Sequence, residues 1–139
     1  MIDKKNINAV FVDLKINDQQ ALYVMLASDG SVQRMGRGTI DNTEIEMFTG
    51  TSADQLFASL MLDVDDSILQ YAGSYHDRSF DGGECQLKLL FQSNDDSTGF
   101  EFVYGTNSQG PPTEICDFII TCVDLTDPWY ERQLSQIGQ

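Results

Sequence analysis

The sequence predicts an α+β fold, in which an antiparallel sheet of about five to six strands carries two main helices packed on it. Several short segments alternate apolar with polar residues, which is the period of a strand with one buried face. A later segment, 113–123, instead spaces its apolar residues by three and four, as an amphipathic helix does. Strand-like and helix-like segments come in separate blocks along the chain, an order typical of α+β domains.

The first part of the chain predicts an antiparallel meander. Residues 9–16 alternate and form the first expected strand, and residues 21–27 follow a polar turn as a more fully buried second strand. Asp29 and Gly30 then favour a tight turn, because both residue types tolerate a positive φ. Residues 31–35 are expected to return as the third strand.

The middle of the chain predicts one further strand and two helices. Residues 44–48 resume a short strand that extends the sheet. Ser52 and Gln55 match a capping box, in which two side chains satisfy free amide groups at a helix start. We therefore expect a helix over 53–62, followed by a short second helix over 67–72.

The second half of the chain predicts a hairpin and its covering helix. Residues 74–83 are polar and indicate a loop or an irregular edge, whereas 85–91 and 100–104 alternate as a pair of strands. The helix of 113–123 should lie on the sheet, with Glu114, Asp117 and Thr121 facing away from its apolar stripe. A separate last turn or short helix is expected to begin at residues 126–128, where a proline interrupts the pattern.

The length and the net charge of the chain limit its possible functions. The chain has 139 residues, the usual size of one domain, so we expect a single globular domain over 1–139. Its 22 acidic against 8 basic residues give a formal net charge of -14. Such a field repels nucleic acid phosphates and anionic membranes, and it steers basic partners toward the protein. The same acidity is also compatible with a role in solubility alone.

Cysteine usage and hydropathy predict a cytoplasmic protein. Cys85, Cys116 and Cys122 have no paired spacing and sit within apolar runs, as reduced buried thiols do. Nothing after Met1 has the apolar core of a leader peptide. No window approaches the roughly 18 apolar residues that a membrane-spanning helix needs.

The familiar catalytic and metal-binding motifs are absent from the sequence, so we expect no enzyme and no cofactor. Ser74 and His76 lack the Gly-x-Ser-x-Gly turn of hydrolases, and one histidine with three scattered cysteines cannot form a recognisable zinc site. The acidic run 63–68 lacks the glycine that a calcium loop has at its sixth position. The run 94–99 has this glycine, but Gly105 stands where the loop's final glutamate should be. The loop 105–112 lacks the Lys-Ser/Thr pair of phosphate loops.

Carboxylates on successive expected loops are the main functional feature of the sequence. If these loops share one end of the sheet, they form either a solvated acidic face or a surface that matches a basic protein. Exposed aromatic residues would anchor such a partner, although a tryptophan is also a common core residue. The candidate partner-binding residues are Asp63, Asp65, Asp66, Asp77, Asp81, Glu84, Asp95, Asp96, Trp129 and Tyr130. Further aromatic candidates are Tyr71, Tyr75 and Phe80.

Three segments, 100–105, 110–114 and 126–131, give the chain a resemblance to the small acidic immunity proteins that bacteria produce against polymorphic or contact-delivered toxins. The resemblance covers mainly the last third of the chain and points to no single family within that group. It implies a cytosolic protein that binds a basic toxin enzyme and occludes its active site or substrate groove. It assigns no role to any individual residue.

Two other functions stay open at the level of sequence. One is a phage-type inhibitor that mimics the charge of nucleic acid. The other is a small enzyme or ligand-binding module with a pocket beneath the loop 105–112. Salt-sensitive binding to one basic protein would support either kind of inhibitor. A deep polar pocket with converging carboxylates would instead favour the enzyme or ligand-binding module.

Overall fold

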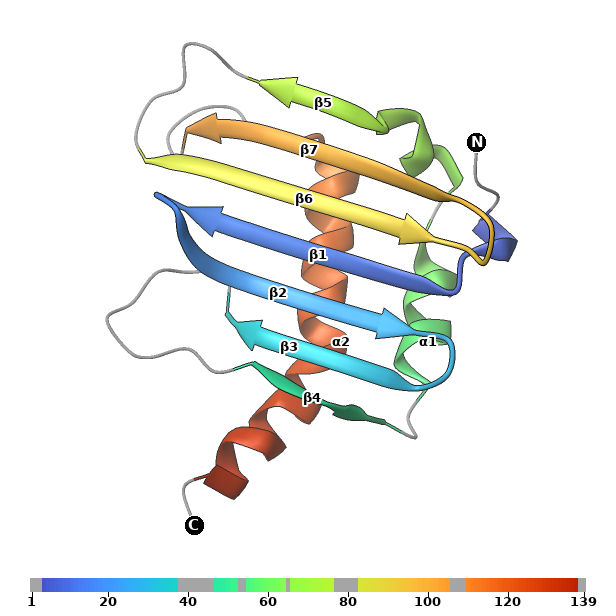
Figure 1. The fold of residues 1–139 in the computed structure, drawn as a ribbon, viewed down its shortest axis with the longest axis vertical. Coiled ribbons are helices and arrows are strands. Elements are labelled where there is room, and N and C mark those ends of the chain that lie inside the picture. The colour runs from blue at the N-terminus through green and yellow to red at the C-terminus, as the bar shows by residue number, and fades with distance from the viewer. Residues whose placement is uncertain are drawn as a thin grey trace.

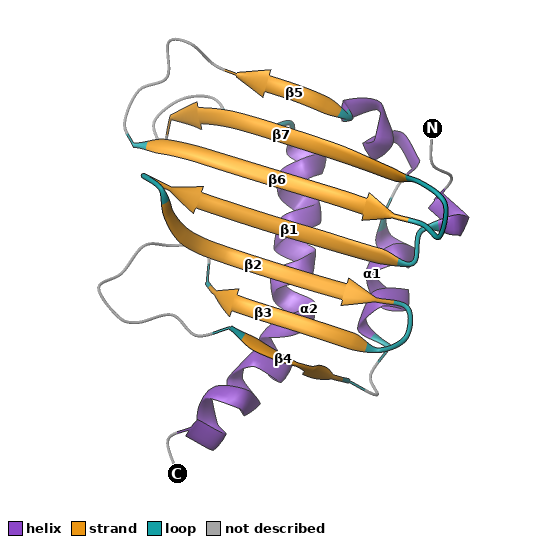
Figure 2. Cartoon of the chain, in the orientation of Figure 1, coloured by secondary structure: helices purple, strands orange, loops and turns teal. Residues whose placement is uncertain are grey.

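The fold consists of one sheet with both helices on the same face (Figure 1, Figure 2). It was obtained as a computed structural model, and the structure describes residues 4–37, 47–52, 55–64, 66–76, 83–105 and 110–137. The strands are β1 (Ala9–Ile16), β2 (Gln19–Ala27), β3 (Ser31–Gly36), β4 (Phe48–Thr51), β5 (Gly73–His76), β6 (Glu84–Gln92) and β7 (Ser97–Gly105). The helices are α1 (Leu56–Asp63) and α2 (Thr113–Ile137), with short 3-10 helices η1 (Lys4–Asn6) and η2 (Asp66–Tyr71).

The α+β class is confirmed, but the described sheet has seven strands rather than five or six, in the order β4-β3-β2-β1-β6-β7-β5. The additional strand is β5, within the segment expected to be a loop or irregular edge. It pairs parallel to β7, and every other pair of neighbours is antiparallel. All four residues of β5 are exposed, so its sequence carries no alternation from which a strand could be predicted.

The predicted meander and hairpin are confirmed, and their register separates the two faces of the sheet. Val12 lies opposite both Val24 and Leu89, and all three side chains are buried beneath the helices. One residue earlier, Phe11 lies opposite Met25 and Leu90, and these three side chains are only partly buried. Because neighbouring residues of a strand point to opposite faces, the second row lies on the face away from the helices.

The stripe predicted for α2 is confirmed, but the helix is longer than expected. Ile115, Phe118 and Cys122 are buried, and the rings of Phe118 and Phe91 lie 5.3 Å apart. The expected break at residues 126–128 is wrong, because α2 continues through Pro128 to its end at Ile137. Proline removes one backbone hydrogen bond and kinks a helix, and Figure 1 shows the last turns of α2 bending away from its first part.

The start of α1 also differs from the prediction. The helix begins at Leu56, and the residue before it, Gln55, has a positive φ of 53° and makes no capping hydrogen bond. The predicted capping box is therefore wrong; residues 53 and 54 lie outside the described part. The second short helix is present as η2. The strand expected over 44–48 is misplaced, because β4 begins at Phe48 and runs to Thr51, while residues 44–46 lie outside the described part.

Candidate functional site

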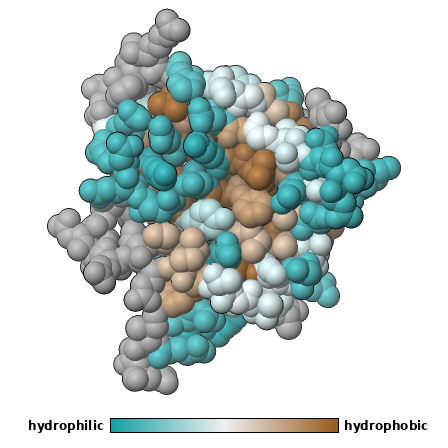
Figure 3. Space-filling view, in the orientation of Figure 1, coloured by the Kyte–Doolittle hydropathy of each residue, from teal (hydrophilic) through white to brown (hydrophobic). Residues whose placement is uncertain are grey.

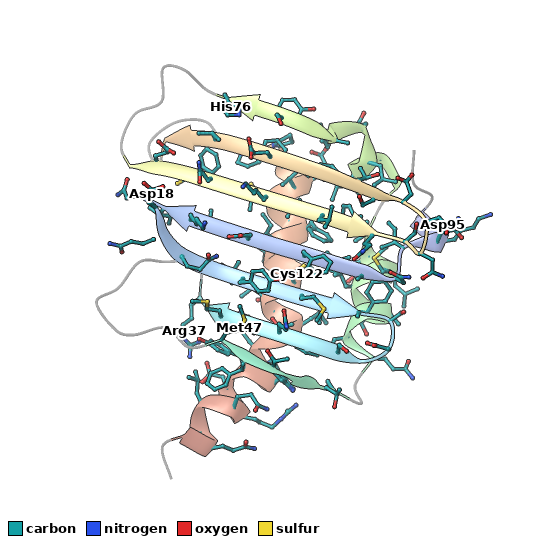
Figure 4. The ribbon with its side chains drawn as sticks, viewed as in Figure 1. Asp18, Arg37, Met47, His76, Asp95 and Cys122 are labelled. Carbon is teal, nitrogen blue, oxygen red and sulfur yellow. The ribbon has the colours of Figure 1, made fainter. Side chains whose placement is uncertain are left out.

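The acidic candidates of the predicted loops do not gather at one end of the sheet. Glu84 begins β6, whereas Asp95 and Asp96 lie in the turn after its end, so this nine-residue strand separates them by roughly 26 Å. Figure 4 labels Asp95 at one end of the sheet and Asp18 at the other, and backbone hydrogen bonding joins Asn17 to Glu84 at the Asp18 end. The condition that these loops share one end of the sheet is therefore not met for Glu84, Asp95 and Asp96, because successive loops of a hairpin lie at opposite ends of a strand.

The other acidic candidates are described unevenly. Asp65, Asp77 and Asp81 lie outside the described residues, and Asp66 is described only as the first backbone position of η2. Asp63 ends α1 and is exposed. It is the one of these five whose surroundings are defined.

Trp129 and Tyr130 are core residues, which confirms the core alternative for Trp129 and contradicts an exposed anchor at either position. Their exposed fractions are 4% and 5%. The indole nitrogen of Trp129 donates to the carbonyl oxygen of Thr51 at 3.2 Å, and the hydroxyl of Tyr130 accepts from the backbone nitrogen of Gly36 at 3.1 Å. Both side chains are buried because they attach the end of α2 to the β3–β4 edge of the sheet.

A buried arginine reinforces the same attachment. Arg34 is 0% exposed, and its Nε donates to the carbonyl oxygen of Gly36 at 2.9 Å. One terminal nitrogen donates to Thr126 Oγ1 at 2.8 Å and lies 3.0 Å from a carboxylate oxygen of Asp127, while the guanidinium stacks over the Tyr130 ring. This cluster was not predicted from the sequence, although the alternation that buries one face of β3 also carries Arg34 to the core.

Asp63 is one of the residues that line a groove between α1, η2 and α2. The groove has a volume of about 180 Å³ and a largely apolar floor that includes the buried Leu60 and Phe118. Glu114 and Asp117, both exposed, line the same groove from the first turns of α2. Its lining residues are Leu60, Asp63, Val64, Ser67, Ile68, Glu114, Asp117, Phe118 and Thr121.

The electrostatics of the groove are one-sided. Three carboxylates line it, and no lysine, arginine or histidine is among its lining residues. The hydroxyl of Tyr71 donates to Glu114 Oε2 at 3.3 Å and so orients this carboxylate. Partial burial, followed by the charge of Glu114, raises the pKa of Tyr71 above its ordinary value. An occupant with a positive charge would therefore complement this lining.

Exposed apolar side chains occur beside the groove. Leu62 is 84% exposed and precedes Asp63, and Ile120 is 56% exposed one turn beyond Asp117 on α2. Exposed side chains of this size beside a polar rim are typical of protein-binding surfaces.

The described residues hold no group of three His, Cys, Asp or Glu side chains suited to a metal ion. His76 Nε2 lies 3.1 Å from Glu101 Oε1 on the exposed β5–β7 edge. Burial raises the pKa of the Cys85 and Cys116 thiols, and it raises that of Cys122 furthest, so the three thiols are poor nucleophiles. Within the part of the chain that the structure describes, no helix is long and apolar enough to span a membrane.

The alternative function requires a pocket beneath the loop 105–112. The structure has an open depression of about 530 Å³ there, and its described lining includes His76, Tyr104 and Pro111. This lining contains no carboxylate. The converging acids that would have favoured an enzyme are therefore not found in the described lining. Residues 106–109 of the loop lie outside the described part.

No protein-family model matches the chain, and no curated protein matches it.

Proposed function

We propose that this chain is a cytosolic, immunity-type inhibitor, which binds a basic toxin enzyme and occludes its active site or substrate groove. The observation that carries the proposal is the acidic groove between α1, η2 and α2, with Asp63, Glu114 and Asp117 in its lining. The other features add to this one observation.

The groove suits a lysine or arginine side chain of a partner protein. Such a side chain would lay its apolar stem on Val64 and Phe118 and place its charged head near the carboxylates of the lining. The volume of about 180 Å³ lies below the roughly 300–1,000 Å³ of pockets for drug-sized ligands. A single side chain delivered by a protein surface is therefore a better occupant than a free small molecule.

Net charge and exposed apolar residues support a protein partner. A net charge of -14 accelerates encounter with a basic enzyme and fixes which surfaces meet. Leu62 and Ile120 supply the apolar contact that charge alone does not. A bound inhibitor of this kind would cover basic residues that an enzyme uses to hold an anionic substrate.

The phage-type mimic of nucleic acid is the second candidate. It requires carboxylates spaced along one surface as phosphates are, but Glu84 and Asp95 lie at opposite ends of β6. A groove that accepts one basic side chain agrees better with occlusion of a specific enzyme.

The test uses the proteins encoded beside this chain's own gene, each produced separately as a possible target. Tagged wild-type protein should capture one of them and inhibit its activity at equal molar amounts. The Asp117→Lys variant should lose this inhibition, whereas the matched Asp124→Lys variant, two turns along the exposed side of α2 and outside the groove lining, should keep it. Capture without inhibition would contradict the inhibitor function, and equal effects of the two variants would contradict the groove.

A further inference from the structure

We propose that two copies of this chain pair through the sheet face that α1 and α2 leave uncovered. We call it the open sheet face; its apolar members are Phe11, Tyr23, Met25, Met35 and Leu90. This pairing does not depend on the proposed function, since it uses the side of the sheet opposite to the acidic groove.

The apolar members form a continuous patch over the central strands. Met25 of β2, Phe11 of β1 and Leu90 of β6 lie directly opposite one another, and Tyr23 and Met35 pair one step further along β2 and β3. All five are only partly buried, and Figure 3 shows apolar side chains gathered near the middle of this face. Gly99 lies opposite Leu90 on β7, so no side chain covers Leu90 from that strand. The patch is therefore accessible.

The charges of the open sheet face are nearly balanced. Asp13, Lys88 and Glu101 lie side by side across β1, β6 and β7, and Lys15 follows Asp13 on the same face. With Glu84 at the margin, three acidic and two basic side chains give a net charge of -1, against -14 for the whole chain. Two copies of this acidic chain repel each other through their net charge, but this repulsion is weak at the open sheet face. The face is therefore better suited to a second copy than to a basic partner.

The size of the face matches a stable dimer. Seven strands about 4.8 Å apart, with central strands of eight or nine residues, span roughly 29 Å by 27 Å. The resulting area of roughly 800 Å² per copy equals the typical contribution of one partner to a specific interface. A two-fold axis would bring each apolar patch against its copy, and mixed charges at the rim can pair across such an axis.

Pairing of this kind leaves the helical side of each copy free. The groove with Asp63 and Asp117 lies on α1 and α2, away from the open sheet face. The dimer would therefore present two acidic grooves on its outer surfaces. A bivalent inhibitor follows if both proposals hold.

The experiment measures the mass of the intact protein in solution by sedimentation equilibrium over a range of micromolar concentrations. The wild-type protein should have twice the 15.5 kDa mass of one chain. Leu90→Glu should weaken self-association by roughly 100-fold, because it places an unpaired charge within the buried interface. Ile120→Glu makes the same kind of change on the helical side and should leave the dimer intact.

Folding is checked by circular dichroism, and Met25→Lys provides a second interface variant should Leu90→Glu not fold. A wild-type monomer throughout this range would overturn the proposal. So would a dimer that Ile120→Glu dissociates and Leu90→Glu does not, because its interface would lie on the helices. A monomer that binds a foreign protein through Phe11 and Leu90 would also overturn it, since the occupant would not be a second copy.

Discussion

Arg34 carries a charge into the core between the sheet and α2, and its environment satisfies that charge only in part. Nε and one terminal nitrogen have hydrogen-bond acceptors, whereas the other terminal nitrogen has none among the described residues. The Asp127 carboxylate, 3.0 Å away, compensates the charge without a well-directed hydrogen bond. Removal of one partner of a buried pair leaves an uncompensated charge, which costs more than the pair contributes.

Asp127→Ala should therefore lower the free energy of unfolding by about 2–3 kcal/mol, somewhat less than for a fully buried pair because the Asp127 side chain is 39% exposed. Arg34→Met combined with Asp127→Ala should cost less than the sum of the two single changes. Urea denaturation measures all three. Arg37→Ala removes the exposed pair with Glu131 and serves as the control, with an expected cost below about 1 kcal/mol. An Asp127→Ala effect no larger than this control would show that the Arg34 charge needs no partner.

Tyr104 gives the protein a pH dependence in the alkaline range. Burial raises the pKa of Tyr104 to about 12 from 10.0, with smaller contributions from Cys85 and Cys116. Between these two values the folded chain holds the phenol proton that the unfolded chain has lost, so stability falls as pH rises. Tyr104→Phe should make this decline shallower in urea denaturation between pH 10 and pH 12. Since Tyr23 also has a raised pKa, part of the decline should remain; an unaltered decline would contradict the assignment to Tyr104.

At the scale of elements, the contact of α2 with β4 holds one edge of the sheet. A Cβ atom placed on Gly50 would lie 3.1 Å from Cζ2 of Trp129, tighter than ordinary van der Waals contact, and the indole is buried. Gly50→Ala should therefore destabilise the protein by about 1–3 kcal/mol through overpacking. Because Trp129 is the chain's only tryptophan, its emission should also shift.

Thermal unfolding and tryptophan fluorescence test this prediction together. Gly99→Ala is the matched control, because its added methyl group would find no atom closer than 3.9 Å. The control should change stability by less than about 0.5 kcal/mol and leave the emission unaltered. Equal behaviour of the two variants would mean that Trp129 does not pack closely on β4.

The same scale shows which elements the sequence could predict. β1, β2 and β3 and the hairpin of β6 and β7 carry their own alternation, so local pattern suffices for them. β5 has four exposed residues, and it forms because it pairs with the free edge of β7. This pairing is a tertiary contact that the local sequence does not indicate. The continuation of α2 was predictable in principle, since Cys122, Thr126, Trp129 and Tyr130 extend the buried stripe at helical spacing. Pro128 outweighed that signal in the prediction.

The candidate site was predictable to a smaller extent. Asp63 was among the acidic candidates, and Glu114 and Asp117 were expected to face away from the apolar stripe of α2. Their meeting with Asp63 across a groove depends on how α1 and α2 lie side by side on the sheet. This arrangement could not be predicted from residue spacing, because Asp63 is about 50 positions from the other two residues in the sequence.

At the scale of the whole molecule, the two sides of the sheet differ in charge. The helical side bears an acidic groove with exposed Leu62 and Ile120, and the open sheet face bears an apolar patch with nearly balanced charges. The first composition fits a basic partner, and the second fits a copy of the chain itself. Changes on one side should therefore leave binding at the other side unaffected.

The central claim is that the groove receives a basic side chain of an enzyme, and association kinetics with the inhibited enzyme test it most directly. Asp117→Lys should increase the dissociation rate by at least roughly tenfold, because it removes a charge from the contact itself. Asp124→Lys changes the net charge equally but lies outside the groove lining, so it should slow association and leave dissociation unaltered. If both variants only slow association, the acidity acts at long range and the groove is not the binding site.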